Sequence, residues 1–167
     1  MDPLDGTRDY SNPYSDEWAV HVALVEQGEP TAGAVAVPDA DMFGSTEAPV
    51  LGDVVGRTRP IVVTGRASAR GGRLVADAIG ADLMACGSAG VKAMLVVTGV
   101  VDVYVHASQL YEWDVCAPAI VAEAAGLVVT DLFGKRLEFN TRYPVVDGLA
   151  ISRPEWAAPV SEALQRR

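Results

Sequence analysis

Short apolar runs alternate with helical patterns from residue 59 to the C-terminus, and this alternation limits the fold more than any other feature of the sequence. Runs rich in Val and Ile predict buried strands, whereas segments of small apolar residues stopped by glycine predict helices. Alternating strands and helices are typical of a layered α/β unit. The pattern predicts strands at 61–64, 83–86, 101–106, 127–130 and 149–152, and helices at 72–79, 89–97, 115–125 and from Pro154 onward.

The segment before residue 59 has a different pattern. Trp18–Val25 and Thr31–Val37 are strand-like runs joined by a short turn, and together they predict an antiparallel hairpin. This hairpin belongs to a second, more antiparallel sheet, because the later strands are separated by helices. We therefore expect an α/β (α+β) fold with two parts, an antiparallel-sheet part at 1–58 and an α/β part at 59–167.

Composition excludes several classes of partner. The chain has 167 residues and a formal net charge of −9, which argues against a nucleic acid polymer, since phosphate backbones require a basic surface. No apolar run is long enough to span a membrane. Two cysteines, Cys86 and Cys116, do not form a disulfide framework, so we expect a cytoplasmic protein. A small anionic ligand is still compatible with this charge, because bound cations reverse the local field.

Residues 2–7 read Asp-Pro-Leu-Asp-Gly-Thr and combine two carboxylates with a tight turn. The proline favours an extended backbone at Asp2, and Asp5 with its glycine forms a strong turn dipeptide. Both carboxylates can then converge on one point, together with the Leu4 carbonyl. Such oxygen ligands suit Mg²⁺, and the N–H groups of Gly6 and Thr7 suit an anion where a helix begins. A solvated turn without a ligand explains the same residues.

Two later segments carry weaker signals. Asp114 stands immediately before a helical run, so it is either an N-cap or a third carboxylate directed at a metal. Small residues from Gly87 open another helix, and Lys92 lies one turn inside it. Ser88 and Lys92 either contact a second anionic group or are an ordinary helix start with a solvated lysine.

The remaining residues with chemical potential fit structural roles. His21 and His106 each fall within a strand pattern, and neither has a second His or a Cys at metal-ligand spacing. Cys86 and Cys116 fit small core residues. No convincing Ser-His-Asp or Cys-His set is present, so we name no protein nucleophile.

Taken in order, these segments resemble the inositol monophosphatase family of Mg²⁺-dependent, lithium-sensitive phosphatases. The resemblance rests on the 2–7 turn, the following hairpin, Gly87-Ser88-x-x-x-Lys92, Trp113-Asp114-x-x-Ala117-Pro118 and Ala124-Ala125-Gly126. Within the family the sequence is most similar to the CysQ-type 3′(2′),5′-bisphosphate nucleotidases, which remove the 3′-phosphate of 3′-phosphoadenosine 5′-phosphate. The resemblance implies a layered α-β-α-β-α sandwich of the sugar-phosphatase type, and inositol monophosphatase or a related sugar phosphatase is the alternative activity.

The resemblance also implies a role for each matching residue. Asp2 bridges two Mg²⁺ ions, the Leu4 carbonyl binds one of them, and Asp5 and Asp114 hold another.

On the substrate side, the N–H groups of Gly6 and Thr7 hold the scissile phosphate, and the Thr7 hydroxyl orients the attacking water. Ser88 and Lys92 face the rest of the substrate, where the lysine favours a second phosphate. The implied partner is therefore a small phosphorylated molecule.

The sequence departs from the family pattern upstream of Asp2, where family members have helices, an apolar strand and a metal-binding glutamate. We expect an N-terminally truncated chain in which the 2–7 turn frays. The unpaired sheet edge predicts self-association, for example as a homodimer. Two further interpretations stay open: a non-catalytic remnant that binds phosphorylated ligands or a partner subunit, and an unrelated acidic cation-binding module.

Overall fold

The chain is organised by two sheets, and the computed structural model describes residues 1–166. The N-terminal sheet is antiparallel throughout, in the order β1-β2-β3-β4. Helix α1 (Thr7–Tyr10) follows its first strand, and the short 3-10 helix η1 (Pro38–Ala40) joins the last two. Its strands are β1 (Asp2–Asp5), β2 (Ala19–Glu26), β3 (Glu29–Val37) and β4 (Met42–Ser45).

The second sheet has five strands in the order β6-β5-β7-β11-β9. Strand β5 is parallel to both of its neighbours, whereas β11 is antiparallel to β7 and β9. A two-stranded antiparallel pair, β8 (Leu110–Tyr111) with β10 (Val145–Val146), lies apart from it. The five strands are β5 (Ile61–Thr64), β6 (Asp82–Ala85), β7 (Val103–His106), β9 (Val128–Thr130) and β11 (Leu149–Ser152).

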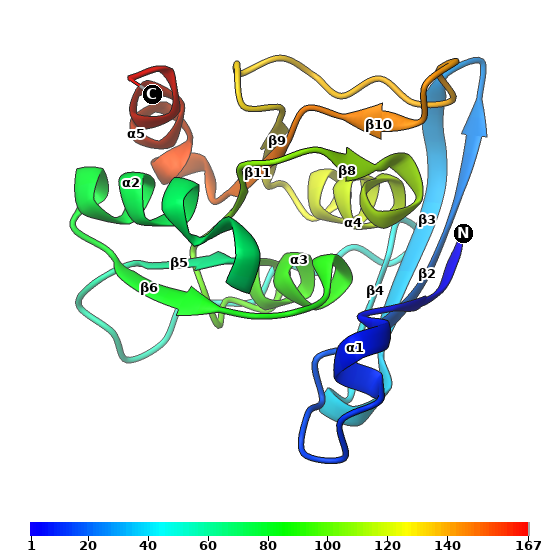
Figure 1. Ribbon diagram of the computed structural model, residues 1–167, viewed down its shortest axis with the longest axis horizontal. Helices are drawn as coiled ribbons and strands as arrows, with labels where there is room; N and C mark the ends of the chain where they lie inside the picture. The colour runs from blue at the N-terminus through cyan, green and yellow to red at the C-terminus, as the bar shows by residue number, and fades with distance from the viewer. Residues whose placement is uncertain (167) are drawn as a thin grey trace.

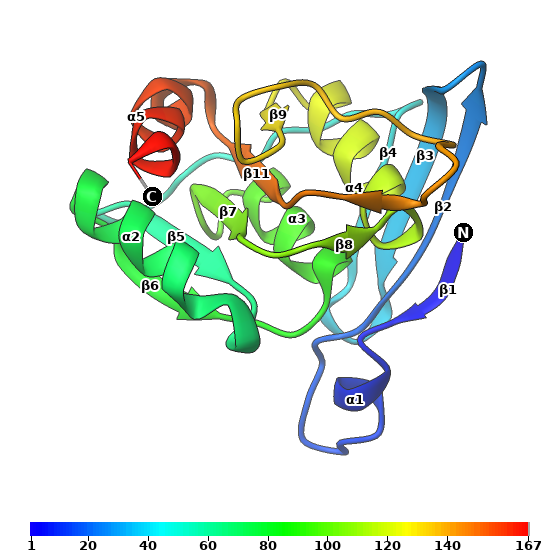
Figure 2. The same cartoon turned by 45° about the horizontal axis from the view of Figure 1, so that its top comes forward.

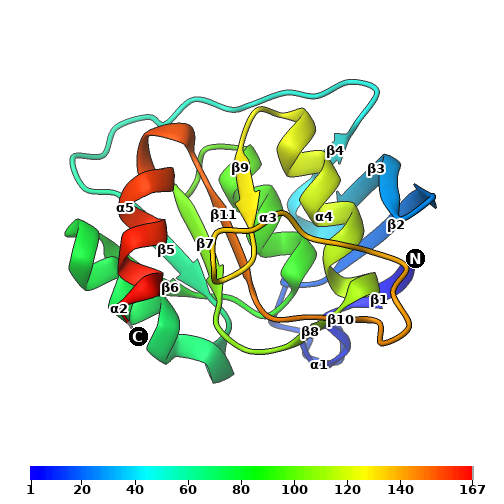
Figure 3. The same ribbon diagram turned by 90° about the horizontal axis from the view of Figure 1, so that it is seen from above.

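Four longer helices complete the layers (Figure 1). Helices α2 and α5 cover one face of the five-stranded sheet, while α3 and α4 pack between the two sheets (Figure 3). The layer order is therefore α-β-α-β. These helices are α2 (Ala69–Ile79, preceded by the 3-10 turn η2, Arg66–Ser68), α3 (Ala89–Val97), α4 (Glu112–Ala124) and α5 (Pro154–Gln165).

The largest apolar core lies around α3 and α4 and takes residues from both sheets, from Val35 in β3 to Tyr104 in β7. Helix α4 sits unusually close to β3, because a Cβ on Gly33 would meet the Ile120 Cγ2 atom at 2.5 Å. The expected boundary between the 1–58 and 59–167 parts falls in the loop between β4 and β5. One apolar core contains residues from both parts. Burial of this core stabilises the fold at about 25 cal/mol per Å² of apolar surface.

The α/β class and the layered arrangement predicted from the sequence are confirmed, with four layers among residues 1–166. The 2–7 turn has a partner that the sequence did not reveal, because Asp2 and Asp5 belong to β1, which pairs with β2. Its expected fraying stays a prediction. The N-cap interpretation of Asp114 is wrong. Tyr111 is the N-cap of α4, and Asp114 lies inside the first turn of that helix. The β8–β10 pair explains this early start, because it carries the chain toward the N-terminal sheet before α4 begins (Figure 2).

Candidate active site

Strand β1 fixes the two carboxylates of the opening turn. Asp2 pairs with His21 of β2, and Asp5 pairs with Ala19. The Leu4 N–H donates to Asp2 Oδ1 at 3.0 Å, which holds the first carboxylate against the strand. Gly6 then turns the chain into α1 with a φ of 88°. A side chain is excluded at this position, because its Cβ would lie 2.6 Å from the carbonyl oxygen of Glu17.

One oxygen of Asp5 accepts most of the nearby donors. Its Oδ2 atom receives the Ser88 hydroxyl at 2.5 Å and the Gly90 N–H at 2.7 Å. The His21 Nε2 atom lies 3.4 Å from the same oxygen. Burial alone would raise the pKa of Asp5, but the contacts with His21, Ser88 and Gly90 outweigh burial and lower the pKa below its usual value. Asp5 is therefore held as a carboxylate.

Asp114 faces the same two acids from the first turn of α4. Burial, followed by the negative charges of Asp5 and Asp2, raises its pKa to about 6. His21 opposes this effect. The structure thus brings Asp114 of α4 toward Asp2 and Asp5, which lie more than a hundred positions earlier in the sequence.

His21 lies within this cluster, although sequence reasoning assigned it an ordinary structural role. One ligand atom each from Asp2, Asp5 and His21 lie within 4.8 Å of one another. His21 is 1% exposed, and neither of its ring nitrogens has a hydrogen-bond partner among the described residues. The alternation of β2 is the signal that could have found it, because Ala19 and His21 share the buried face opposite Asp2.

Ser88 and Lys92 have structural partners. Ser88 caps α3 by accepting the Val91 N–H at 3.0 Å while donating to Asp5. The ammonium of Lys92 is buried and donates to the carbonyls of Ser88 at 2.6 Å and Gly87 at 2.5 Å, with a longer contact to Cys86. It also lies 5.1 Å from the ring centroid of Tyr104. Their predicted contact with a substrate stays a prediction.

Thr7 is the first residue of α1 and is exposed. The N–H groups of Asp9 and Tyr10 donate to the Gly6 carbonyl, which closes this single helical turn. The predicted phosphate contacts of Gly6 and Thr7, like the predicted metal contact of the Leu4 carbonyl, stay predictions.

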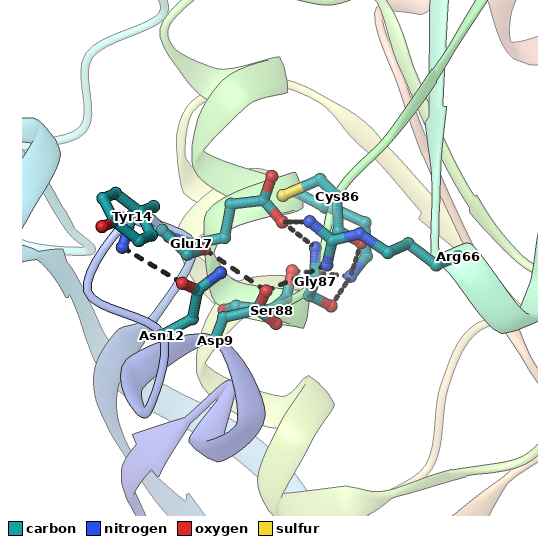
Figure 4. A network of polar contacts seen from close by, with 10 residues as sticks. Asp9, Asn12, Tyr14, Glu17, Arg66, Cys86, Gly87 and Ser88 are labelled. Carbon is teal, nitrogen blue, oxygen red and sulfur yellow. Dashed lines mark hydrogen bonds and ion pairs between the residues drawn. The ribbon is translucent and has the colours of Figure 1, made fainter.

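An ion-pair network that the sequence did not reveal fastens the segment after α1 to the start of α3 (Figure 4). Arg66 contacts Asp9 at 3.0 Å and Glu17 at 2.6 Å. The same Glu17 oxygen accepts the Gly87 N–H at 2.6 Å. Charged acceptors make such hydrogen bonds short and strong. The loop from α1 to β2 is thereby tied to the turn that carries Ser88.

A pocket of about 240 Å³ opens beside the acid cluster, between β2 and the start of α4. Its walls include His21, Trp113 and Phe139. Trp113 stacks on Tyr111 with ring centroids 4.3 Å apart, and both rings are partly exposed.

No helix among residues 1–166 has the length and apolar character that crossing a membrane requires.

Comparison with known proteins gives consistent results. The chain is 38% identical over 177 residues to a 3′-phosphoadenosine 5′-phosphate phosphatase of Mycobacterium tuberculosis, covering 96% of this chain and 63% of that protein. It is 30% identical to human 3′(2′),5′-bisphosphate nucleotidase 1, covering 84% of this chain and 51% of the relative. The chain thus spans less than two thirds of the length of these relatives.

Solved structures share the fold. An inositol monophosphatase of Thermotoga maritima superposes with a TM-score of 0.78 at 22% identity, covering 99% of this chain and 67% of the other. A staphylococcal inositol monophosphatase, solved as an inhibitory complex after soaking in LiCl, gives the same TM-score at 18% identity, covering 98% of this chain and 64% of the other. The model of the inositol monophosphatase family matches residues 1–166. The chain belongs to the inositol monophosphatase family.

Proposed function

We propose that this chain supplies the catalytic acids of a Mg²⁺-dependent phosphate monoester hydrolase whose substrate is 3′-phosphoadenosine 5′-phosphate. The observation that carries the proposal is the group formed by Asp2, Asp5 and His21, whose ligand atoms lie within 4.8 Å of one another. Asp114 faces the two acids of this group from α4. The names of the mycobacterial and mammalian relatives support this substrate.

The donor set of the cluster fits a hard divalent cation. Carboxylate oxygens are the preferred protein ligands of Mg²⁺. Burial and then the like charges of Asp5 and Asp2 raise the pKa of Asp114, and a cation is the natural counter-charge for such a group. A solved family structure that holds Mg²⁺ and phosphate supports the choice of metal. When bound, Mg²⁺ stabilises charge on phosphoryl oxygens and acidifies a coordinated water.

The chain's own residues then position the reactants. Asp2, Asp5, Asp114 and the Leu4 carbonyl would hold the cations. The N–H groups of Gly6 and Thr7 would hold the scissile phosphate, and the Thr7 hydroxyl would orient the attacking water. Phosphoryl transfer depends mainly on such positioning and on electrostatic stabilisation, so no side-chain nucleophile is needed.

Inositol phosphates are the second candidate substrates. Lys92 favours a bisphosphorylated nucleotide when the sequence is read alone, but its ammonium donates to carbonyl oxygens inside the fold. The preference for a nucleotide therefore rests on the relatives alone. Solved family members bound to inositol monophosphate support the alternative.

Two features concern location and assembly. Cys86 and Cys116 are free thiols, which supports a reducing, cytoplasmic location. Val22, Leu24 and Phe43 are exposed on the N-terminal sheet, which supports the homodimer expected from the sequence. Sedimentation velocity over a range of concentrations tests the second point.

Phosphate release with Mg²⁺ tests the function. We expect the chain to hydrolyse 3′-phosphoadenosine 5′-phosphate in preference to inositol 1-phosphate, and Asp114→Asn to abolish release. Asp77→Asn, on an exposed position of α2, is the matched control and should retain activity. A preference for inositol 1-phosphate would support the second substrate. No release by the unmodified chain, with phosphorylated ligands still bound, would support the non-catalytic remnant.

A further inference from the structure

His21 lies in the acid cluster and is a buried polar side chain that makes no hydrogen bond with the described residues. Both ring nitrogens are buried, and neither has a partner among the described residues. Buried polar groups nearly always find a partner, so an orphaned one calls for a specific explanation. Leaving such a group unsatisfied costs about 1–3 kcal/mol.

The nearest acceptor to the ring is Asp5. His21 Nε2 lies 3.4 Å from Asp5 Oδ2, which is longer than a good N–H···O hydrogen bond. The same oxygen already accepts the Ser88 hydroxyl and the Gly90 N–H. Three donors thus lie near Oδ2, and this arrangement leaves Oδ1 as the oxygen of Asp5 available to a cation.

Packing prevents the imidazole from moving away. His21 is fixed by pairing with Asp2 across the β1–β2 ladder. On the other side, a Cβ on Gly90 would lie 3.0 Å from the His21 Cδ2 atom, so α3 presses against the ring. The ring therefore stays beside Asp5, with its Nε2 atom a few tenths of an ångström beyond ordinary hydrogen-bond distance.

We propose that His21 is a positioning residue that donates its Nε2–H to Asp5 Oδ2 when Asp5 binds a divalent cation. Catalytic hydrogen bonds are often long in a free site and tighten in the complex. Partners behind a metal ligand orient it, and losing one weakens metal affinity about 10- to 100-fold. The inference rests on the proposed cation site, and it assigns to His21 a role in selecting the orientation of Asp5 rather than in contacting the substrate.

A matched pair of substitutions separates this role from simple packing. His21→Phe keeps the bulk of the ring and removes the donor, whereas His21→Gln keeps an N–H near the position of Nε2. We expect Mn²⁺ affinity, measured by electron paramagnetic resonance, to fall about 10- to 100-fold in His21→Phe and to recover largely in His21→Gln. His106→Gln, on β7, is the control and should bind Mn²⁺ as the unmodified chain does. Equal affinity in His21→Phe and the unmodified chain would overturn the proposal.

Nuclear magnetic resonance of the unmodified chain gives a second test that does not depend on how the variants fold. Adding Mg²⁺ should make the His21 Nε2–H exchange more slowly with water. Loss of that proton on adding the cation would identify His21 as a direct metal ligand and overturn the positioning role. A chain that binds no divalent cation at all would overturn both the cation site and this inference, whereas binding with an unchanged His21 signal would overturn the inference alone.

Discussion

The ammonium of Lys92 lies 2.5 Å from the carbonyl oxygen of Gly87, inside the fold, at the turn that leads into α3. Burial lowers the pKa of Lys92 below its usual value. The carbonyls of this turn accept hydrogen bonds from Lys92, whereas its N–H groups bind acids. The Gly87 N–H donates to Glu17, and the Gly90 N–H donates to Asp5. Lys92 thus stabilises the turn whose N–H groups bind Glu17 and Asp5.

Removing this cation should destabilise the fold. Lys92→Met keeps the length of the side chain but leaves the carbonyls of Gly87 and Ser88 without a donor, so we expect a loss of about 2 kcal/mol in the free energy of unfolding. Urea denaturation checks this, with the exposed Lys135→Met as the control. Unchanged stability combined with weaker substrate binding would instead favour the substrate contact predicted from the sequence.

Asp114→Asn should stabilise the chain in the absence of divalent cations, although it removes a proposed metal ligand. The substitution relieves repulsion among the carboxylates of Asp114, Asp5 and Asp2. Because the site is partly exposed, solvent screening limits the gain to roughly 1 kcal/mol. Thermal unfolding at pH 8 with a chelator should show a higher Tm, and added Mg²⁺ should raise the Tm of the unmodified chain only. A lower Tm of Asp114→Asn with the chelator would contradict the convergence of these acids.

Stability should fall on acidification partly because of His106. Burial, followed by the charge of Lys92, lowers the pKa of His106 to about 4 from an ordinary 6.5. Below pH 6.5 the unfolded chain takes up a proton that the folded chain refuses, so this group's contribution to stability is full above pH 6.5 and is lost as the pH falls toward 4. Urea denaturation at pH 7 and pH 5 measures the loss.

His106→Gln isolates this contribution, since the other titrating groups are common to both chains. The difference in unfolding free energy between pH 7 and pH 5 should be smaller in the variant. An identical pH dependence in the two chains would show that His106 does not titrate in this way.

Arg66→Met should loosen the segment after α1 without unfolding the protein. Arg66 is half exposed, so the loss of its pairs with Asp9 and Glu17 should cost no more than about 1 kcal/mol. Hydrogen exchange at residues 11–17 should become several-fold faster, because this loop opens locally. Arg59→Met, which removes an exposed pair with Asp82 elsewhere, is the control. Faster exchange across the whole chain would contradict a local role.

Much of this fold could be predicted from the periodicity of the sequence. The hairpin of β2 and β3 and the helix at Ala89–Val97 lie close to their predicted places. The start of α4 was missed because it follows the β8–β10 pair, whose two-residue strands are too short to show a period. Strand β1 was missed for a similar reason, since its pairing depends on a partner that begins at Ala19.

The site shows a second limit of sequence reasoning. Every residue of α3 is buried, so the solvated face that a lysine ordinarily indicates does not exist, and Lys92 turns toward backbone carbonyls. His21 went unrecognised because a single His in a strand has no spacing signal, and only the register with Asp2 reveals its neighbours. The convergence of Asp2, Asp5 and Asp114 could be anticipated from the family resemblance but not from the separate segments.

The close packing of α4 on β3 at Gly33 joins the two elements that support the acid cluster. Asp114 is carried by the helix, whereas Asp5 and His21 are carried by the sheet to which β3 belongs. The absence of a side chain at Gly33 therefore lets Ile120 of α4 pack directly against β3. A methyl group at residue 33 would meet the Ile120 Cγ2 atom at 2.5 Å, so the side chain of Ile120 would have to shift. The packing of the helix that carries Asp114 therefore depends on a position that holds no functional group.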